Sequence, residues 1–230
     1  MKKEFKGLTV VNGTGKGKAR IVDCSCPDYK VRKIDDCDKE LGRFVRILKQ
    51  YCADTRELIN YTEKNIGHRE SRILDSHIKM VHDLALQSEL IDLISNGMCA
   101  EEATDKICDS YISRFLETDV EFVRQLAVDV MDLKTNVLNL LLGIDQPDVE
   151  HFEEDTVVLS KELTPSVFSR IDLVHTKAIV VEYGNPNSHC AQIHRATGIP
   201  GMIRARGILS EIHDGDVVEF DGETGTIRVV

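Results

Sequence analysis

The sequence predicts a mixed α and β fold in which an all-α helical bundle interrupts an α/β domain. Three observations lead to this prediction. Short apolar runs typical of strands lie near the N-terminus, residues 35–143 lack proline and repeat apolar residues at helical spacing, and strand and helix patterns resume after Pro147. We therefore expect segments 1–30 and 146–230 to form one domain around a bundle at 31–145.

The first strands are expected within residues 7–22, where two apolar runs flank the glycine-rich sequence from Gly13 to Lys18. This sequence lacks the spacing of a phosphate-binding P-loop, and Ala19 takes the place of the hydroxyl residue that such a loop needs. We interpret it as the turn of a strand–turn–strand element.

Five helices are expected in the bundle. Their apolar positions run over residues 41–61, 73–81, 86–94, 100–115 and 119–141. Asn96-Gly97 ends the third helix, and Gly143 ends the fifth. The short connections imply that neighbouring helices run antiparallel.

The C-terminal part predicts an alternation of strands and helices. Strands are expected at residues 157–159, 178–181, 217–220 and 226–229, and helices at 164–171 and 189–197. Turns containing Asp-Gly separate the last strands.

Composition narrows the possible partners and location. The formal net charge of −10 argues against nucleic acid as the main partner. No apolar run is long enough to cross a bilayer, the N-terminus lacks the apolar stretch of a secretion signal, and the seven cysteines are irregularly spaced. Such cysteines are typical of reduced thiols, so we expect a cytoplasmic protein without membrane insertion.

Acidic residues are concentrated in one part of the predicted bundle. Residues 83–132 contain twelve Asp and Glu but three Lys and Arg. This excess favours either a basic protein partner or an ordinary solvated helical surface.

The most informative segment follows the strand at 178–181. The chain turns at Gly184 and Pro186, Ser188-His189 opens a helix, and Gly198-Ile199-Pro200 ends it. A histidine at a helix start lies near backbone N–H groups and the positive end of the helix dipole, which suits an imidazole that carries a phosphate. The alternative is a surface histidine without function.

Gly184, Ser188-His189, Arg195 and Gly198-Ile199-Pro200 resemble the phosphohistidine motif of phosphoenolpyruvate-utilising enzymes. Over the whole chain, segments 17–19, 73–80 and 163–166 resemble the N-terminal half of Enzyme I, the phosphoenolpyruvate–protein phosphotransferase family of the bacterial sugar phosphotransferase system. The resemblance implies a helical bundle inserted into a β/β/α swivelling phosphohistidine domain.

The same resemblance implies that His189 receives a phosphoryl group originating from phosphoenolpyruvate and passes it to an HPr-like phosphocarrier protein. It also implies a C-terminal barrel, not included in these residues, that binds phosphoenolpyruvate and Mg²⁺, so we expect no cofactor in this chain. Ser188, Asn187 and Arg195 are expected to support the phosphate site. Ser188 can instead serve only as a helix cap, and Arg195 can pair with an acid elsewhere.

His77, His68 and Asp83 are expected to contribute to partner binding. For His77, packing inside the bundle is the alternative. The sequence departs from the family pattern at Pro186, at Phe168 in place of a threonine and at Leu126 in place of an arginine. These departures keep two other functions open: a carrier-binding module with a degenerate site, and the phosphohistidine domain of a dikinase-type enzyme, which the helical insert argues against.

Overall fold

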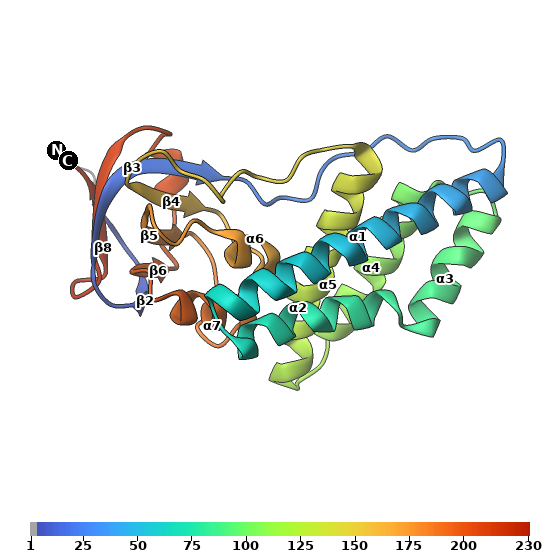
Figure 1. Ribbon diagram of the computed structural model, residues 1–230, viewed down its shortest axis with the longest axis horizontal. Helices are drawn as coiled ribbons and strands as arrows, with labels where there is room; N and C mark the ends of the chain where they lie inside the picture. The colour runs from blue at the N-terminus through green and yellow to red at the C-terminus, as the bar shows by residue number, and fades with distance from the viewer. Residues whose placement is uncertain (1–3) are drawn as a thin grey trace. The chain divides into compact units, whose positions relative to one another are not determined.

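A computed structural model describes residues 4–230 and divides into two compact units (Figure 1). Unit 1 combines the N-terminal segment up to Cys24 with Pro147–Val230, and unit 2 comprises Ser25–Gln146. The mixed α and β fold class agrees with the prediction. No helix among residues 4–230 is both long and apolar enough to cross a membrane.

Unit 1 is built on one mixed sheet. Its strands within the described residues are β1 (Glu4–Lys6), β2 (Leu8–Val11), β3 (Thr14–Val22), β4 (Thr156–Ser160), β5 (Thr176–Val181), β6 (Gly201–Ile203), β7 (Val217–Asp221) and β8 (Thr226–Val229). They follow the order β1-β8-β7-β3-β4-β5-β6-β2. The pairs β3–β4, β4–β5 and β5–β6 are parallel, and the other neighbours are antiparallel.

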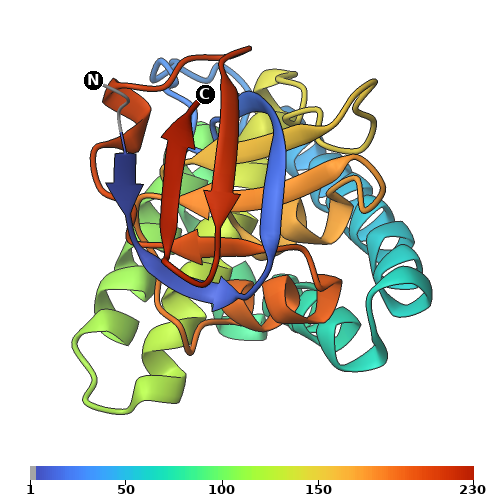
Figure 2. The same cartoon turned by 90° about the vertical axis from the view of Figure 1, so that its left-hand side faces the viewer.

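The two edges of this sheet meet at Gly7. Strands β1 and β2 lie at opposite ends of the strand order, although Gly7 alone separates them in sequence. Adjacent Cα atoms are about 3.8 Å apart, so the sheet curls until its edges come together, as Figure 2 shows. A Cβ at Gly7 would lie 2.6 Å from the carbonyl oxygen of Ile203, which explains why a glycine stands here.

The predicted glycine turn is wrong in one respect. The break between β2 and β3 falls at Asn12-Gly13, whereas Gly15 and Gly17 lie inside β3. A Cβ would lie 2.1 Å from the carbonyl oxygen of Lys177 at Gly15 and 2.4 Å from that of Asp155 at Gly17. These glycines let neighbouring backbone approach closely. Strands β2 and β3 also do not pair, because β2 pairs with β6 and β3 lies between β4 and β7.

The described part of unit 1 also contains two helices and a short 3₁₀ helix: α6 (Pro165–Arg170), α7 (His189–Thr197) and η1 (Ile208–Ser210). All five residues of β4 are buried, as expected for a central strand covered on both faces. Val157, Val180, Met202 and Phe220 belong to one buried cluster of the sheet, which also includes Ile208 of η1.

Unit 2 contains the five predicted helices. They are α1 (Cys37–Asn65), α2 (His68–Val81), α3 (Leu84–Ser95), α4 (Ala100–Leu116) and α5 (Glu121–Leu142). Asp36 and Asp83 cap α1 and α3 through their side chains, and Gly143 ends α5 in a left-handed conformation. Phe44, Leu90 and Leu138 are among the buried residues of the bundle core.

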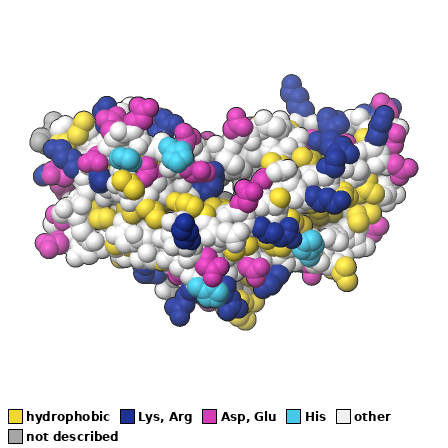
Figure 3. Space-filling view, viewed as in Figure 1, with side chains coloured by type: hydrophobic (Ala, Val, Ile, Leu, Met, Phe, Trp, Pro, Cys, Tyr) yellow, Lys and Arg dark blue, Asp and Glu magenta, His cyan; other side chains and the backbone are white. Residues whose placement is uncertain are grey.

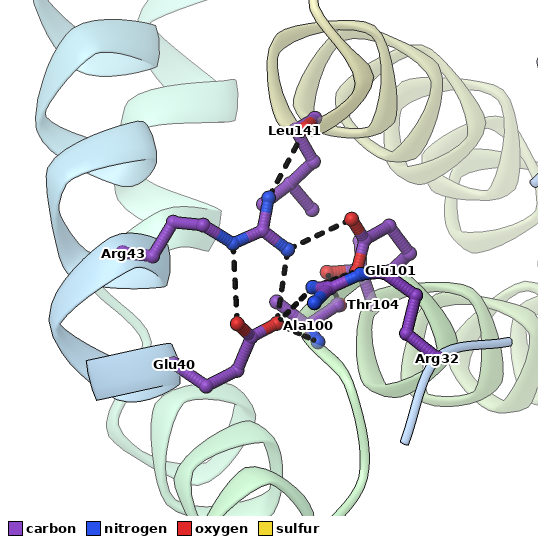
Figure 4. A network of polar contacts seen from close by, with 7 residues as sticks. All are labelled: Arg32, Glu40, Arg43, Ala100, Glu101, Thr104 and Leu141. Atoms are coloured by element: carbon purple, nitrogen blue, oxygen red, sulfur yellow. Dashed lines mark hydrogen bonds and ion pairs between the residues drawn. The ribbon is translucent and has the colours of Figure 1, made fainter. Parts of the chain in front are cut away.

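An ion-pair network joins α1, α4 and the segment before α1 (Figure 4). The Arg43 guanidinium donates to Glu40 at 2.9 Å and to Glu101 at 2.7 Å, and Arg32 contacts both carboxylates. Glu40 also accepts the N–H of Ala100 at 2.9 Å and so caps α4 from another helix. Burial raises the pKa of Glu40, but the bonds from Arg43 and Ala100 outweigh it and bring that pKa to about 2.

Candidate functional site

The segment before His189 first continues the sheet and then turns. Beyond the end of β5, the N–H groups of Glu182 and Tyr183 donate at 3.0 Å to the carbonyls of Ser160 and Lys161. At Gly184 the backbone adopts φ +142°, and a Cβ there would lie 3.1 Å from the side chain of Ile203. The turn predicted at Gly184 therefore requires a glycine.

Asn185 and Ser188 fold residues 185–188 into a compact turn. The Asn185 side-chain oxygen accepts the N–H of Asn187 at 2.9 Å. The Asn185 carbonyl accepts the Ser188 N–H at 3.0 Å and the Ser188 hydroxyl at 2.8 Å. The Ser188 oxygen in turn accepts the N–H of Ala191 at 3.2 Å, so Ser188 is the N-cap of α7.

His189 is the first residue of α7 and is half-buried. Its position places the imidazole in the first turn of the helix, where the dipole favours negative charge. Arg195 donates from its guanidinium to the carbonyl of Pro186 and makes no ion pair within residues 4–230. The expected pairing of Arg195 with an acid is therefore not found, and this side chain instead ties α7 to the turn that precedes His189.

The inner face of α7 is anchored by a second histidine, His194, which is not among the site residues predicted from the sequence. Its Nε2 lies 3.1 Å from the carbonyl oxygen of Ile199, to which it donates, and its ring packs on that of Phe168. Burial lowers the pKa of His194 to about 4, so the ring is neutral near pH 7. This buried position could have been found from the sequence, because His194 follows the apolar residue Ala191 by three positions. Residues three apart lie on the same face of a helix, and both are buried here.

Cys190 adds a third anchor for α7. Its thiol donates to the carbonyl of Leu163 at 3.1 Å, just before α6. Together these contacts fix α7 from its first turn to its end. Of the two histidines in the helix, His194 is enclosed and bonded to the backbone, whereas His189 stands at the helix start.

The expected partner-binding residues of unit 2 occupy three separate places. His68 is exposed at the start of α2, with Nδ1 2.8 Å from Glu63. Asp83 is exposed at the start of α3, where it accepts the N–H of Leu86 at 2.9 Å. Because the whole of α2 lies between them, His68 and Asp83 are about 20 Å apart along its axis.

His77 lies inside the bundle. It is 1% exposed, with Nε2 3.6 Å from Asp129 and Nδ1 3.9 Å from Asp132, distances too long for hydrogen bonds. Burial lowers the pKa of His77, but the two carboxylates outweigh this effect and raise it overall. Of the two alternatives for His77, the structure favours packing, because the ring has no surface to offer a partner.

Part of the acidic excess of residues 83–132 is also internal. Glu101, Asp129 and Asp132 are buried. Asp105 and Asp109 both pair with Lys134. The surface of the bundle is therefore less acidic than the sequence count suggests. No three His, Cys, Asp or Glu side chains among residues 4–230 are grouped so that they could hold a metal ion.

Family models match two parts of the chain. The model described as PEP-utilising enzyme, N-terminal, matches residues 6–125, and the model described as PEP-utilising enzyme, mobile domain, matches residues 152–225. The second match includes the whole segment from β5 through α7 to β7.

Curated relatives carry the name phosphoenolpyruvate-protein phosphotransferase. Those of Mycoplasma capricolum, Listeria innocua and Staphylococcus carnosus are 23%, 27% and 26% identical to this chain over its whole length. The chain spans 40% of the length of each of these relatives.

Solved structures agree in fold. The solution structure of an Enzyme I protein (nEIt) aligns with 98% of this chain and 92% of its own, at a TM-score of 0.80 and 23% identity. The N-terminal domain of Enzyme 1 - Nitrogen aligns with 98% of this chain and 93% of its own, at a TM-score of 0.66 and 21% identity. The chain therefore belongs to the family of phosphoenolpyruvate-utilising enzymes, whose N-terminal and mobile domains it matches.

Proposed function

We propose that His189 carries a phosphoryl group between a phosphoenolpyruvate-binding domain and an HPr-like phosphocarrier protein in the cytoplasm. Membership of the family and the names of the curated relatives support this proposal. The observation that carries it is the location of His189 in the first turn of α7, directly after its N-cap.

The transfer step needs an unprotonated ring nitrogen of His189. This nitrogen attacks phosphorus while the bond from phosphorus to the leaving group breaks, and the leaving group takes the electron pair. With the carrier as donor, the leaving group is the carrier's own imidazole, which then takes up a proton. The N-terminal end of α7 stabilises the charge on the phosphoryl oxygens.

Ser188, Asn187 and Arg195 have supporting roles in this proposal. Ser188 and Asn187 hold the turn that presents the imidazole, and Arg195 fixes that turn to the helix. Their contribution is to position His189, since even a small displacement of a reacting group slows transfer strongly.

In this proposal phosphoenolpyruvate and Mg²⁺ bind to a C-terminal barrel outside the 230 residues. Phosphoenolpyruvate alone is therefore not expected to label the chain. The carrier docks on unit 2, where His68 and Asp83 are exposed at the two ends of α2. His77 acts there only by shaping the bundle from inside.

Incubation of the chain with a phosphorylated HPr-like carrier tests the proposal. Intact-mass measurement should show one added phosphoryl group, which acid removes and base does not. The His189→Ala variant should remain unlabelled. The His213→Ala variant is the matched control, because His213 is an exposed histidine of unit 1 outside α7, and it should still accept the label on His189. Label that persists in His189→Ala would contradict the proposal.

A carrier-binding module with a degenerate site is the second candidate function. It is favoured by Phe168. The family pattern has a threonine at this position, whose hydroxyl is expected to hydrogen-bond the active imidazole, here His189. Phe168 has no hydroxyl, and its ring packs on His194 instead. Pro186 also offers no N–H group to a phosphate. Tight binding of the carrier without any transfer of label would establish this function instead.

A further inference from the structure

Unit 2 contains a groove that the proposed phosphoryl transfer does not use. It lies between α1, the end of α2 and α3, and its volume is about 440 Å³. The lining residues are Phe44, Val45, Leu48, Lys49, Cys52, Arg56, Val81, His82, Gln87 and Ile91. A volume of this size is typical of small-molecule sites.

The floor of the groove is apolar. Phe44, Cys52 and Val81 are buried and Leu48 is half-buried. Val45 and Ile91 remain 39% and 40% exposed at the rim. A concave apolar surface left open to water gains free energy when a hydrocarbon group covers it.

The charged residues of the groove are all basic. Lys49, Arg56 and His82 line it, and no Asp or Glu does, although the formal net charge of the chain is −10. Figure 3 shows Lys and Arg side chains beside hydrophobic ones over this part of unit 2. Within residues 4–230, the side chains of Lys49, Arg56 and His82 form no hydrogen bond or ion pair, unlike Arg43 in the bundle core.

The spacing of α1 brings the two permanent cations to the same side of the groove. Val45, Lys49, Cys52 and Arg56 follow one another at intervals of four, three and four residues, so they lie along one helix face. Lys49 and Arg56 are two turns apart, about 10.5 Å along the axis, which their long side chains can bridge. Arg56 lies one helical turn beyond Cys52 on this face, and both residues line the groove. Burial raises the pKa of the Cys52 thiol, and the charge of Arg56 partly offsets that rise.

We infer that this groove binds a small organic monoanion with an apolar body, such as the anion of a medium-chain fatty acid. Lys49 and Arg56 hold its carboxylate, and its hydrocarbon chain covers the floor made by Phe44, Leu48 and Val81. A protein partner fits less well, because stable interfaces involve roughly 20–30 residues on each side, whereas ten residues line this groove.

Titration of the full chain with decanoate, kept below its aggregation concentration, tests this inference. Calorimetry should show saturable binding of one decanoate, weakened by salt. Amide shifts in ¹H–¹⁵N spectra should concentrate at residues 44–56 and 81–91. The Lys49→Gln and Arg56→Gln variants should each raise the Kd for decanoate about fivefold. This increase corresponds to the loss of one exposed ion pair whose strength is near the upper end of the usual range. Decanol, which keeps the apolar body but lacks the charge, should bind more weakly than decanoate.

Two further variants separate the site from general effects. Ile91→Glu places a negative charge on the rim and should abolish decanoate binding. Leu84→Glu is the matched control, because Leu84 is an exposed apolar residue of the same helix, α3, that does not line the groove. His189→Ala should bind decanoate as the wild type does, so failure of the proposed phosphoryl transfer is distinguishable from failure here.

Three results would overturn the inference, provided that the variants unfold at the same temperature as the wild type. The first is the absence of saturable binding of decanoate to the wild type. The second is an unchanged Kd in Lys49→Gln and Arg56→Gln. The third is equal affinity for decanol and decanoate, which would remove the role of the basic residues.

Discussion

The ring of Phe168 packs against the ring of His194, with centroids 5.4 Å apart and planes tilted by 32°. Both side chains are buried. Because Phe168 lies in α6 and His194 in α7, this contact joins the two helices behind the N-terminal turn that carries His189. The orientation of α7 therefore depends on a residue at which the sequence departs from its family pattern.

We expect Phe168→Ala to lower the free energy of unfolding of unit 1 by about 3–5 kcal/mol, the usual cost of emptying a buried aromatic site. Chemical denaturation followed by circular dichroism measures this change. The variant should also slow phosphorylation of His189, since α7 loses its support. Val217→Ala, at a site that is 40% exposed in β7, is the control and should change stability by less than about 0.5 kcal/mol.

Removal of Arg43 should destabilise unit 2 strongly. Arg43→Met removes one of the two cations that pair with the buried carboxylates of Glu40 and Glu101. A buried charge that loses its partner entirely destabilises a protein by about 3–5 kcal/mol. Arg32 still contacts both carboxylates, so we expect the lower part of this range. Urea unfolding of the variant measures the difference.

The control for Arg43 is Lys79→Met. Lys79 pairs with Asp75 at 2.7 Å on the surface of α2, one turn away. Such pairs contribute about 0.3–0.5 kcal/mol. Equal effects of the two substitutions would show that the network of Figure 4 is no more important than an exposed pair.

His77 should make the stability of unit 2 depend on pH. The folded-state pKa of His77 is raised by Asp129 and Asp132 against the opposing effect of burial. Protonated His77 therefore stabilises the fold fully below its ordinary pKa of about 6.5, and this contribution is lost as pH rises through the folded-state pKa. Unfolding free energies of the wild type and His77→Gln across this range should converge toward high pH. A difference that stays constant or grows would contradict this prediction.

Asp172 should produce the opposite dependence in unit 1. Its carboxylate accepts the N–H groups of Phe152 and Val174 at 3.0 and 2.8 Å and contacts Nδ1 of His175 at 2.9 Å. Although burial opposes the shift, these bonds hold the pKa of Asp172 well below its usual range. The stabilisation is present above the ordinary pKa of about 3.9 and is lost as pH falls through the lower folded-state value.

Asp172→Asn should therefore reduce the unfolding free energy at pH 7 by about 1–3 kcal/mol and make it less sensitive to acid. Acid titration of the two proteins, followed by fluorescence or circular dichroism, measures both effects. Asp155→Asn is the control, since Asp155 is exposed and pairs with Lys177 at 3.2 Å on the surface. An identical acid response of all three proteins would exclude the role given to Asp172.

The sequence predicts the helices well because their signal is local. The apolar spacing around Leu48, Leu90 and Leu133 reports directly which side of each helix is buried. The start of α7 at His189 and its end at Gly198 were likewise predictable, because capping residues act on their nearest neighbours.

Features that depend on distant residues were not predictable. Gly15 and Gly17 are needed within β3 because the carbonyls of Lys177 and Asp155 approach them too closely to leave room for a side chain. These carbonyls lie far along the chain, so nothing near the glycines in the sequence indicates the contact. The short strands β1 and β6 exist only because the sheet supplies their partners. The partner of Arg195 was missed because it is a backbone carbonyl, which leaves no pattern in the sequence.

The position of β3 between β4 and β7 has a consequence for synthesis on the ribosome. The N-terminal strands are translated before the whole of unit 2. The bundle can fold as soon as its own residues are made, whereas β3 stays unpaired until β4 and β7 have been translated. An unpaired strand is prone to aggregation during such a delay. The exposed Lys16, Lys18 and Arg20, which alternate along β3, give the nascent segment positive charges that discourage wrong pairing.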